Sequence, residues 1–304
     1  MINLNSPKDL IIPFFSKYEQ SCGTYGKVFP PNSIDSRKWF LIFEKKMLEV
    51  LSKKIYFPLF RLSDGEFIFC LGRKFSHYSF LNKINALFNH IKRSLYYKST
   101  FYSSGRKGYC ETYGLLQLKN LRKNFFRNLK YISEKGILCF NYDMHELTYP
   151  YLESFNEDLK NNNISLNLNN YFQFYFVPGF FLGKRINEIY KNKKILIFTS
   201  PIKDRNIKLA KTLYKFGAKN VEFYLTSLNQ PMLDKIDLDL IKVNPDLCLI
   251  GAGVGAINIL YQISDLKCPC IDVGFIVDAL SDFELAKTRP YYLNDYYFKN
   301  KDSW

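Results

Sequence analysis

The sequence lacks any apolar run that approaches the roughly 18 residues of a membrane-spanning helix. Its first residues, Met1–Lys8, lack the basic start and apolar centre of a secretory signal peptide. The 304 residues also contain no internal repeat and no linker long enough to separate two domains. These absences predict a cytoplasmic protein built around one core, which can still touch the inner face of the membrane.

The cysteines are not spaced as they are in redox or zinc-binding motifs. The seven cysteines are an odd number, and they stand at positions 22, 70, 110, 139, 248, 268 and 270. Only one residue separates Cys268 from Cys270, whereas redox and zinc pairs are separated by two. Several of the others lie in apolar, strand-like runs. The sequence therefore predicts buried, reduced thiols and no structural zinc site.

Positive charge is in excess, with a formal net charge of +15. Such an excess favours acidic partners: nucleotides, phosphorylated lipid carriers, nucleic acid or an anionic membrane surface. Lys, Asn, Ile, Phe and Tyr are abundant throughout the sequence. A general bias in amino-acid composition is therefore an alternative explanation of the positive charge. The basic residues form no long block and match no recognised nucleic-acid motif, so we do not expect nucleic-acid binding.

Apolar segments of strand and helix type alternate along most of the chain. The predicted strands are 55–60, 136–140, 172–177, 194–199, 221–225, 247–250 and 270–273. The predicted helices are 36–54, 80–97, 113–133, 146–160, 206–216, 231–243 and 256–264. This alternation predicts an α/β fold, with a mainly parallel, Rossmann-like sheet and helices on both faces. We expect an N-terminal arm at 1–38, one domain at 39–285 and an aromatic C-terminal tail at 286–304.

The stretch Arg61-Leu-Ser-Asp64-Gly65-Glu66 follows the first predicted strand. Two carboxylates beside a core are costly unless they are paired or bind a cation. Gly65 allows close approach of the backbone to a ligand. Asp64 and Glu66 can then bind one divalent ion through oxygen, and the planar Arg61 side chain suits a phosphate. The alternative is a turn in which Asp64 caps the next helix and Arg61 forms a structural ion pair.

A glycine-rich turn follows a later strand. Gly251-x-Gly253-x-x-Ala256 fits the dinucleotide-binding fingerprint, with Ala in the last place. Asp272 lies 21 positions after Gly251, where a ribose-binding acid would stand. This pattern favours an NAD(P)-dependent oxidoreductase. The same turn, extended to Gly255, would also bind a nucleoside diphosphate at a helix N-terminus.

Two further groups of side chains follow predicted strands. Lys203 and Arg205 are weaker candidates for a diphosphate contact. Asp143, His145 and Glu146 follow the strand at 136–140 and are candidates for a general base. A helix cap with acidic residues in the first turn explains the second group equally simply.

The order of these motifs resembles that of the bacterial GT-D type glycosyltransferases. That family carries an Arg-x-Gly-Asp-Gly-Glu stretch with a DXE motif, a late glycine-rich turn between strand and helix, and an Asp-Ile-Gly segment. The corresponding segments here are Arg61–Glu66, 246–256 and 271–274, and the resemblance covers roughly residues 50–285. Phe275 stands where the family commonly has His, which indicates a different acceptor.

The resemblance implies transfer of a sugar from a nucleotide-sugar donor, commonly a UDP-sugar, with Mn²⁺ or Mg²⁺ as cofactor. Asp64 and Glu66 would be the DXE acids, and the acceptor a bacterial surface glycan, glycolipid or glycoprotein. Ligands of parallel sheets bind beyond the carboxyl ends of the strands, so these acids and the Gly251–Gly255 turn should share that edge. The alternatives are the oxidoreductase and a non-enzymatic basic module that binds membrane or nucleic acid.

Overall fold

The protein is described here from a computed structural model. It describes residues 36–62, 64–71, 113, 115–140, 152–167, 169–174, 176–183 and 185–282. The predicted helix at 80–97, the tail at 286–304 and all but the last residues of the predicted arm lie outside these ranges.

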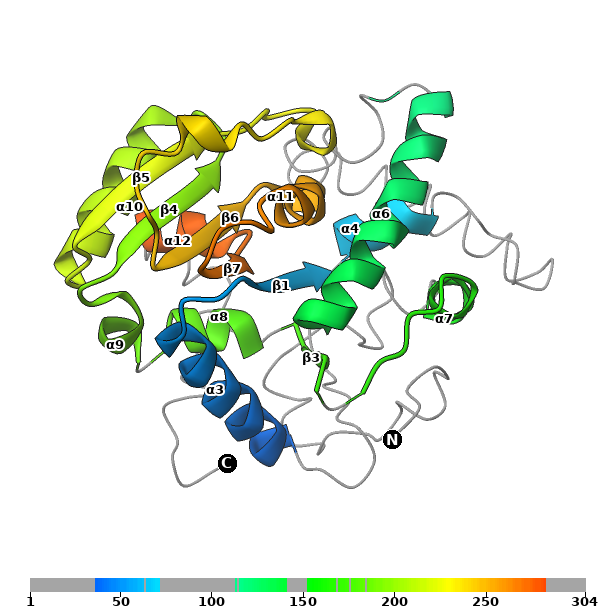
Figure 1. Cartoon of the computed structure of the whole chain (residues 1–304), viewed down its shortest axis with the longest axis horizontal. Helices are drawn as coiled ribbons and strands as arrows, with labels where there is room; N and C mark the ends of the chain where they lie inside the picture. Colours follow the sequence, from blue (N-terminus) through cyan, green and yellow to red (C-terminus); the bar gives the residue numbers. More distant parts are fainter. Residues whose placement is uncertain are drawn as a thin grey trace, which may run out of the picture.

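A seven-stranded, fully parallel sheet forms the centre of the described part (Figure 1). The strand order is β3-β2-β1-β7-β6-β4-β5. The strands are β1 (Phe57–Leu62), β2 (Ile137–Phe140), β3 (Tyr171–Gln173), β4 (Lys194–Thr199), β5 (Asn220–Leu225), β6 (Leu247–Gly251) and β7 (Pro269–Asp272). Most are continuous apolar runs, as parallel strands covered on both faces require. The predicted α/β fold with a parallel sheet is confirmed.

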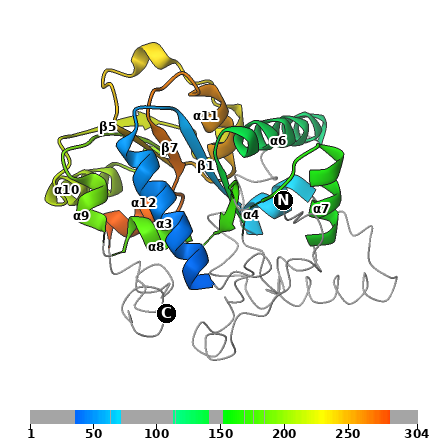
Figure 2. The same ribbon diagram turned by 60° about the horizontal axis from the view of Figure 1, so that its bottom comes forward.

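Helices cover both faces of this sheet (Figures 1 and 2). One face carries α4 (Asp64–Leu71), α6 (Leu115–Lys135), α7 (Leu152–Asn161) and α11 (Ala256–Gln262). The other carries α3 (Ser36–Ser52), α8 (Phe176–Phe181), α9 (Ile186–Tyr190), α10 (Lys203–Lys215) and α12 (Ile276–Ser281). No described helix has both the length and the apolar character that a membrane crossing needs.

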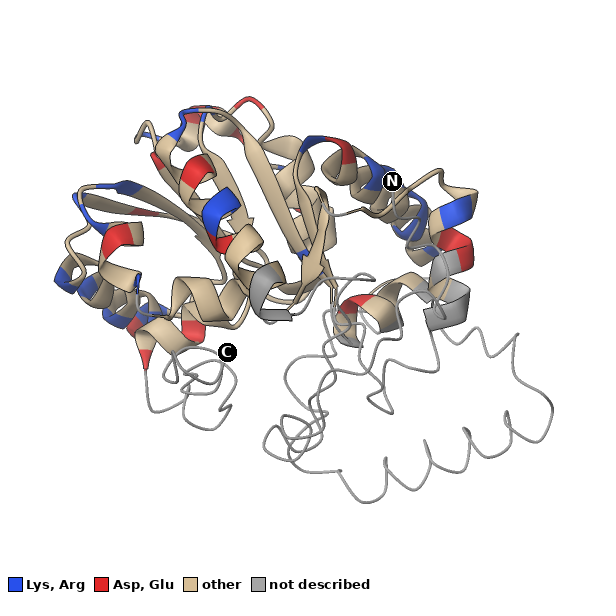
Figure 3. Cartoon of the chain, turned by 90° about the horizontal axis from the view of Figure 1, so that it is seen from below, with Lys and Arg blue, Asp and Glu red and all other residues tan. Residues whose placement is uncertain are grey.

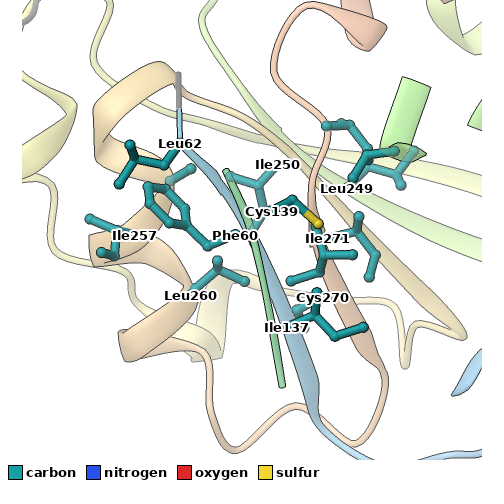
Figure 4. Close-up of a cluster of buried hydrophobic side chains, with 14 of the residues drawn as sticks. Phe60, Leu62, Ile137, Cys139, Leu249, Ile250, Ile257, Leu260, Cys270 and Ile271 are labelled. Atoms are coloured by element: carbon teal, nitrogen blue, oxygen red, sulfur yellow. The ribbon is translucent and has the colours of Figure 1, made fainter. Parts of the chain in front are cut away.

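The core is built from alternate residues of the central strands. Phe60 and Leu62 of β1 lie toward Ile257 and Leu260 of α11 (Figure 4). Phe60 also meets Phe125 of α6 edge to face, with ring centroids 5.8 Å apart. On the other face, large aromatic side chains of α3 pack against β3 and α8. Burial of these side chains stabilises the packing of helices on both faces of the sheet.

The predicted helix at 231–243 is wrong. The chain instead forms two short 3₁₀ turns, η4 (Pro231–Leu233) and η5 (Leu238–Leu240). The side-chain amides of Asn258 and Gln262 in α11 donate to the carbonyl of Asp234, at 3.1 and 2.9 Å. These tertiary hydrogen bonds satisfy backbone groups that a helix would have satisfied within itself.

The predicted strand at 172–177 is correct only at its start. β3 ends at Gln173, and α8 begins at Phe176. All six residues of α8 are buried, and a fully buried helix is as apolar as a buried strand. Periodicity therefore could not separate the two.

Candidate functional site

The three central strands end beside the motifs that the sequence singled out. β1 leads into α4 at Asp64, β6 leads into the turn Gly251–Gly255, and β7 ends at Asp272. The last three residues of that turn form η6 (Gly253–Gly255), and α4 packs directly against η6. The chain leaves β1 toward the face of the sheet that carries α4 and α11, and it leaves β7 toward the face that carries α12. Ligands of parallel sheets commonly bind where neighbouring strands lead to opposite faces in this way. The structure thus brings the Asp64–Glu66 segment and the glycine-rich turn together at the predicted edge.

Arg61 and Asp272 form a buried ion pair at this edge, with side chains only 6% and 5% exposed. The Arg61 backbone N–H donates to Asp272 Oδ2 at 3.0 Å, and Arg61 Nε donates to the Asp272 carbonyl at 2.9 Å. Arg61 Nη2 lies 3.8 Å from Asp272 Oδ1. The guanidinium also lies over the ring of Phe174, 4.8 Å from its centroid. The structural ion pair considered for Arg61 is therefore present.

Two polar atoms of the Arg61–Asp272 pair make no hydrogen bond. Arg61 Nη1 and Asp272 Oδ1 are both buried, and neither has a hydrogen-bond partner in the described protein. Burial raises the pKa of Asp272 to about 6, while Arg61 and the backbone N–H groups of Arg61 and Gly274 oppose that rise. One donor and one acceptor are thus left without a partner in one small region.

Gly274 makes room for the guanidinium. Its φ is +44°, and a Cβ at this position would lie 1.9 Å from Arg61 Nη2. Any side chain here would displace Arg61 as well as strain the backbone. The sequence interpretation missed Gly274 and Phe174. Gly274 belongs to the Asp272–Gly274 segment of the resemblance, but no sequence signal points to Phe174.

Asp272 is not placed as a ribose-binding acid would be. Its carboxylate faces Arg61 and the interior, and the residue is 3% exposed. A phosphate approaching Arg61 would likewise meet the carboxylate beside it. The geometry therefore supports neither the ribose contact predicted for Asp272 nor the phosphate contact predicted for Arg61.

The first turn of α4 carries the two predicted metal-binding acids. The helix begins at Asp64, and Glu66 is its third residue, a position from which a Glu side chain reaches back to the helix N-terminus. Glu66 is 8% exposed and Gly65 is buried. The side chain of Asp64 lies outside the described part. Phe67 anchors the turn against Phe155 of α7, with centroids 5.0 Å apart.

Close packing explains why two of the three glycines in the glycine-rich turn must be glycine. A Cβ on Gly251 would lie 2.6 Å from Val277 Cγ2, and one on Gly255 would lie 2.3 Å from Pro231 Cβ. Gly253 is exposed and has a φ of +52°. Only Gly253 therefore fits the description of a glycine kept for close approach of a ligand.

The remaining predicted site residues differ in whether their side chains already form hydrogen bonds within the protein. Arg205 donates from Nη1 to Asp278 Oδ1 at 3.1 Å, and from Nη2 to Thr199 Oγ1 at 2.6 Å. Further bonds to its neighbours occupy the rest of the guanidinium. Lys203 is exposed at the start of α10. Asp143, His145 and Glu146 lie outside the described residues.

The described cysteines match the prediction of buried thiols. Cys70, Cys139, Cys248, Cys268 and Cys270 are free and buried. The Sγ atoms of Cys268 and Cys270 are 3.9 Å apart, too far for a disulfide. Burial raises the pKa of the Cys139, Cys248 and Cys270 thiols, which makes them poor nucleophiles. Among described side chains, no group of three or more His, Cys, Asp and Glu is placed to hold a metal ion.

No protein-family model and no curated protein matches this sequence. Two solved structures are similar in fold. One is a domain of unknown function 1792 described as highly conserved and as having a distinct glycosyltransferase fold, with a TM-score of 0.46. The other is a selenomethionine-substituted domain of the same kind, with a TM-score of 0.43. Each is 14% identical and covers 84% of this chain and 94% of its own.

Proposed function

We propose that this chain is a metal-dependent glycosyltransferase that moves a sugar from a nucleotide-sugar to a bacterial surface-glycan acceptor. A UDP-sugar is the proposed donor, and Mn²⁺ or Mg²⁺ the proposed cofactor. The packing of α4 against the Gly253–Gly255 turn carries the proposal. It unites a carboxylate-bearing helix start and a glycine-rich turn at the ligand-binding edge of a parallel sheet.

The donor set at the start of α4 fits such an ion. Carboxylate oxygens are the ligands that Mg²⁺ and Mn²⁺ prefer, and Glu66 is positioned to reach the helix N-terminus. Two protein carboxylates, from Asp64 and Glu66, would leave the other coordination positions to diphosphate oxygens and water, as is usual for Mg²⁺. When bound, the ion would neutralise charge on the leaving nucleoside diphosphate.

The chain's own groups would bind and orient the donor. The backbone at Gly253 is exposed and free of a side chain, so a diphosphate can approach it closely. Lys203 is exposed at the start of α10, which follows the neighbouring strand β4, and it offers a positive charge. Both groups act by attraction to the diphosphate.

A general base for the acceptor hydroxyl is proposed among Asp143, His145 and Glu146. They follow β2, and β2 ends at Phe140, which pairs with Leu62 at the end of β1. The chain therefore leaves β2 beside the point where it leaves β1. The net charge of +15 suits an acceptor on a phosphorylated lipid and peripheral contact with the inner face of the membrane, and we propose no role for nucleic acid.

The burial of Asp272 speaks against the oxidoreductase alternative. A ribose-binding acid must offer its carboxylate to the cofactor. Here the carboxylate is enclosed beside Arg61. The glycine-rich turn alone is a general phosphate motif and does not require a nicotinamide cofactor.

Thermal unfolding with added ligands tests the proposal. A ligand at a hundredfold excess over its Kd stabilises the folded state by about 2.7 kcal/mol. At roughly 2–4 °C per kcal/mol, UDP with Mn²⁺ should raise the melting temperature by several degrees. UDP alone should raise it less, because the carboxylates repel the diphosphate. The variant Glu66→Gln should lose most of the metal-dependent increment but keep part of the UDP effect.

NAD⁺ serves as the comparison ligand in the same experiment, at one scan rate because unfolding can be irreversible. We expect no shift with NAD⁺. A clear shift with NAD⁺, and none with any nucleoside diphosphate plus metal, would overturn the transferase in favour of the oxidoreductase.

A further inference from the structure

Helix α10 and the residues that follow it carry a run of positive charge with no acid in it. Between Asp204 and Glu222 the chain has no other Asp or Glu, but it has five basic residues: Arg205, Lys208, Lys211, Lys215 and Lys219. Blue segments follow one another along this helix, at the left of Figure 3. Arg205 is paired with Asp278. The four lysines are exposed, and among the described residues no acid forms an ion pair with any of them.

One face of α10 points outward, since the other packs against α12 and β5. The basic α10 face, as we call the outward one, consists of the exposed residues Ile207, Lys208, Lys211, Tyr214 and Lys215. Its three lysines follow one another at spacings of three and four residues, so they are neighbours on the helix surface and repel one another. An anionic partner would remove that repulsion.

Apolar side chains lie among these charges. Ile207 is 45% exposed and Tyr214 is 49% exposed, and Ile202, just before the helix, is 43% exposed. Ile207, Lys211 and Tyr214 are four and three residues apart, so they form one stripe along the helix. This mixture suits the surface of an anionic bilayer, because alkyl groups and rings enter the interface while the ammonium groups stay at the headgroups.

The exposed face of α6 is also basic, but its composition differs. Lys119 and Lys123 are accompanied there by the amide side chains of Gln117 and Asn120. Among the described side chains of α6, only Leu116 is large, apolar and exposed. Positive charge alone therefore does not distinguish the two helices, whereas the combination of lysine with exposed Ile and Tyr marks α10.

We infer that the basic α10 face binds the surface of an anionic lipid bilayer. This surface would supply the peripheral membrane contact of the proposed function, and it rests on that function only for its role, the presentation of a lipid-linked acceptor. α10 begins at Lys203, shortly after β4 ends at Thr199. A bilayer on this face would thus lie beside the edge of the sheet that carries the candidate site. Nucleic acid also attracts lysines, but through phosphates alone, with no apolar layer for Ile207 and Tyr214.

Co-sedimentation with vesicles, in the absence of UDP and Mn²⁺, tests the membrane contact. Vesicles of phosphatidylcholine alone are compared with vesicles of an equal mixture of phosphatidylcholine and phosphatidylglycerol. The wild-type chain should bind the anionic vesicles and not the neutral ones, and its affinity should fall as the salt concentration rises. The triple variant Lys208→Gln, Lys211→Gln, Lys215→Gln should lose about fivefold in affinity per lysine, on the order of a hundredfold in all.

A triple variant of α6 is the matched control: Lys119→Gln, Lys123→Gln, Lys135→Gln. It removes the same charge from exposed helix positions on the other face of the sheet. Its affinity for anionic vesicles should stay within about threefold of wild type, because only charges within a Debye length of the bilayer contribute strongly. Gln is a good helix former, and melting temperatures close to that of the wild type would show that both variants fold.

The single variant Ile207→Gln tests the apolar part of the contact. It should weaken binding to anionic vesicles severalfold, and its affinity relative to wild type should be the same at low and high salt, because salt does not screen apolar burial. Leu116→Gln on α6 is its control. That side chain is more exposed, at 82%, and its replacement should leave the affinity unchanged.

Four results would overturn the assignment of this face to a bilayer. The first is a wild-type chain that does not bind anionic vesicles. The second is an equal loss in the α6 and α10 triple variants, as a general effect of the net charge of +15 predicts. The third is an unchanged affinity of Ile207→Gln. The fourth is a single-stranded oligonucleotide that binds more tightly than the vesicles and loses affinity in the α10 variant, which would identify a nucleic-acid surface.

The membrane contact and the transferase can fail separately. No vesicle measurement involves a nucleotide, so a chain that binds anionic vesicles but not UDP with Mn²⁺ would contradict the proposed function and keep the basic α10 face. A chain that binds UDP with Mn²⁺ but no anionic vesicle would do the reverse.

Discussion

Arg61 and Arg205 lie at or beyond the carboxyl ends of strands of the same sheet, and each pairs with an acid near α12. The Arg205–Asp278 side chains are 15% and 35% exposed, whereas those of Arg61 and Asp272 are 6% and 5% exposed. Arg205 uses all three of its guanidinium nitrogens within the protein. Arg61 leaves Nη1 without a partner in the described part.

The difference shows that residue type and position beside a strand do not predict whether the hydrogen-bonding groups of an arginine are all satisfied within the protein. The chain around Arg205 supplies Thr199, Ser200 and Asn206 within a few residues, and these satisfy it locally. Arg61 stands between buried apolar residues that offer no such partners. Its partner comes from a strand 211 residues away.

The largest difference between the two ion pairs should appear in protein stability when each arginine is replaced. In Arg61→Met the Asp272 carboxylate would stay buried without its partner, and we expect the free energy of unfolding to fall by about 3–5 kcal/mol. Arg205→Met should cost clearly less, because water reaches Asp278. Urea unfolding of the two variants measures both values. Equal losses would show that the burial of the Arg61–Asp272 pair has no special energetic weight.

The buried Asp272 should make the stability of the protein depend on pH. Its folded-state pKa of about 6 lies above the ordinary value of 3.8. The folded state therefore binds the proton more tightly, and this group's contribution to the free energy of unfolding falls as pH rises from about 4 to 6. The fall corresponds to about 3 kcal/mol at most, and it is complete above that range.

The variant Asp272→Asn lacks this titration. The unfolding free energy of the wild type minus that of Asp272→Asn should therefore decrease as pH rises from 4 to 6, and stay constant from 6.5 to 8. Guanidinium unfolding at each pH gives the difference. A difference that is flat over the whole range, or that increases with pH, would contradict the burial of an ionised Asp272.

The smallest effect is expected at Lys203, the neighbour of Arg205 that is exposed. Lys203→Gln removes a surface charge and should change the free energy of unfolding by less than about 0.5 kcal/mol. If Lys203 contacts the diphosphate, affinity for UDP should fall severalfold, more at low salt than at high salt. Unchanged UDP affinity at low salt would remove Lys203 from the site.

Much of this architecture was predictable because parallel strands are buried on both faces and read as apolar runs. The strands at 194–199, 221–225 and 247–250 appear almost as predicted. The segment 231–243 was not predictable, because hydrogen bonds from Asn258 and Gln262 decide its shape.

The candidate site also has features that the sequence could predict and features that it could not. Placement of the Asp64–Glu66 segment and the glycine-rich turn at one edge follows from a general rule about parallel sheets. The Arg61–Asp272 pair does not, since nothing local in the sequence links two residues so far apart. Two of the glycines in the turn are explained by Val277 and Pro231, partners that a fingerprint does not contain.

The pairing of β1 with β7 has a consequence for synthesis of the chain. β1 emerges from the ribosome early, with β2 to follow on one side, but β7 is the last of the described strands to be made. Until then one hydrogen-bonding edge of β1 is open, and an open strand edge invites association with other chains. A nascent chain that ended before residue 269 would lack the centre of its sheet. The Arg61–Asp272 pair would thus form in a single late step, when β7 fills that gap.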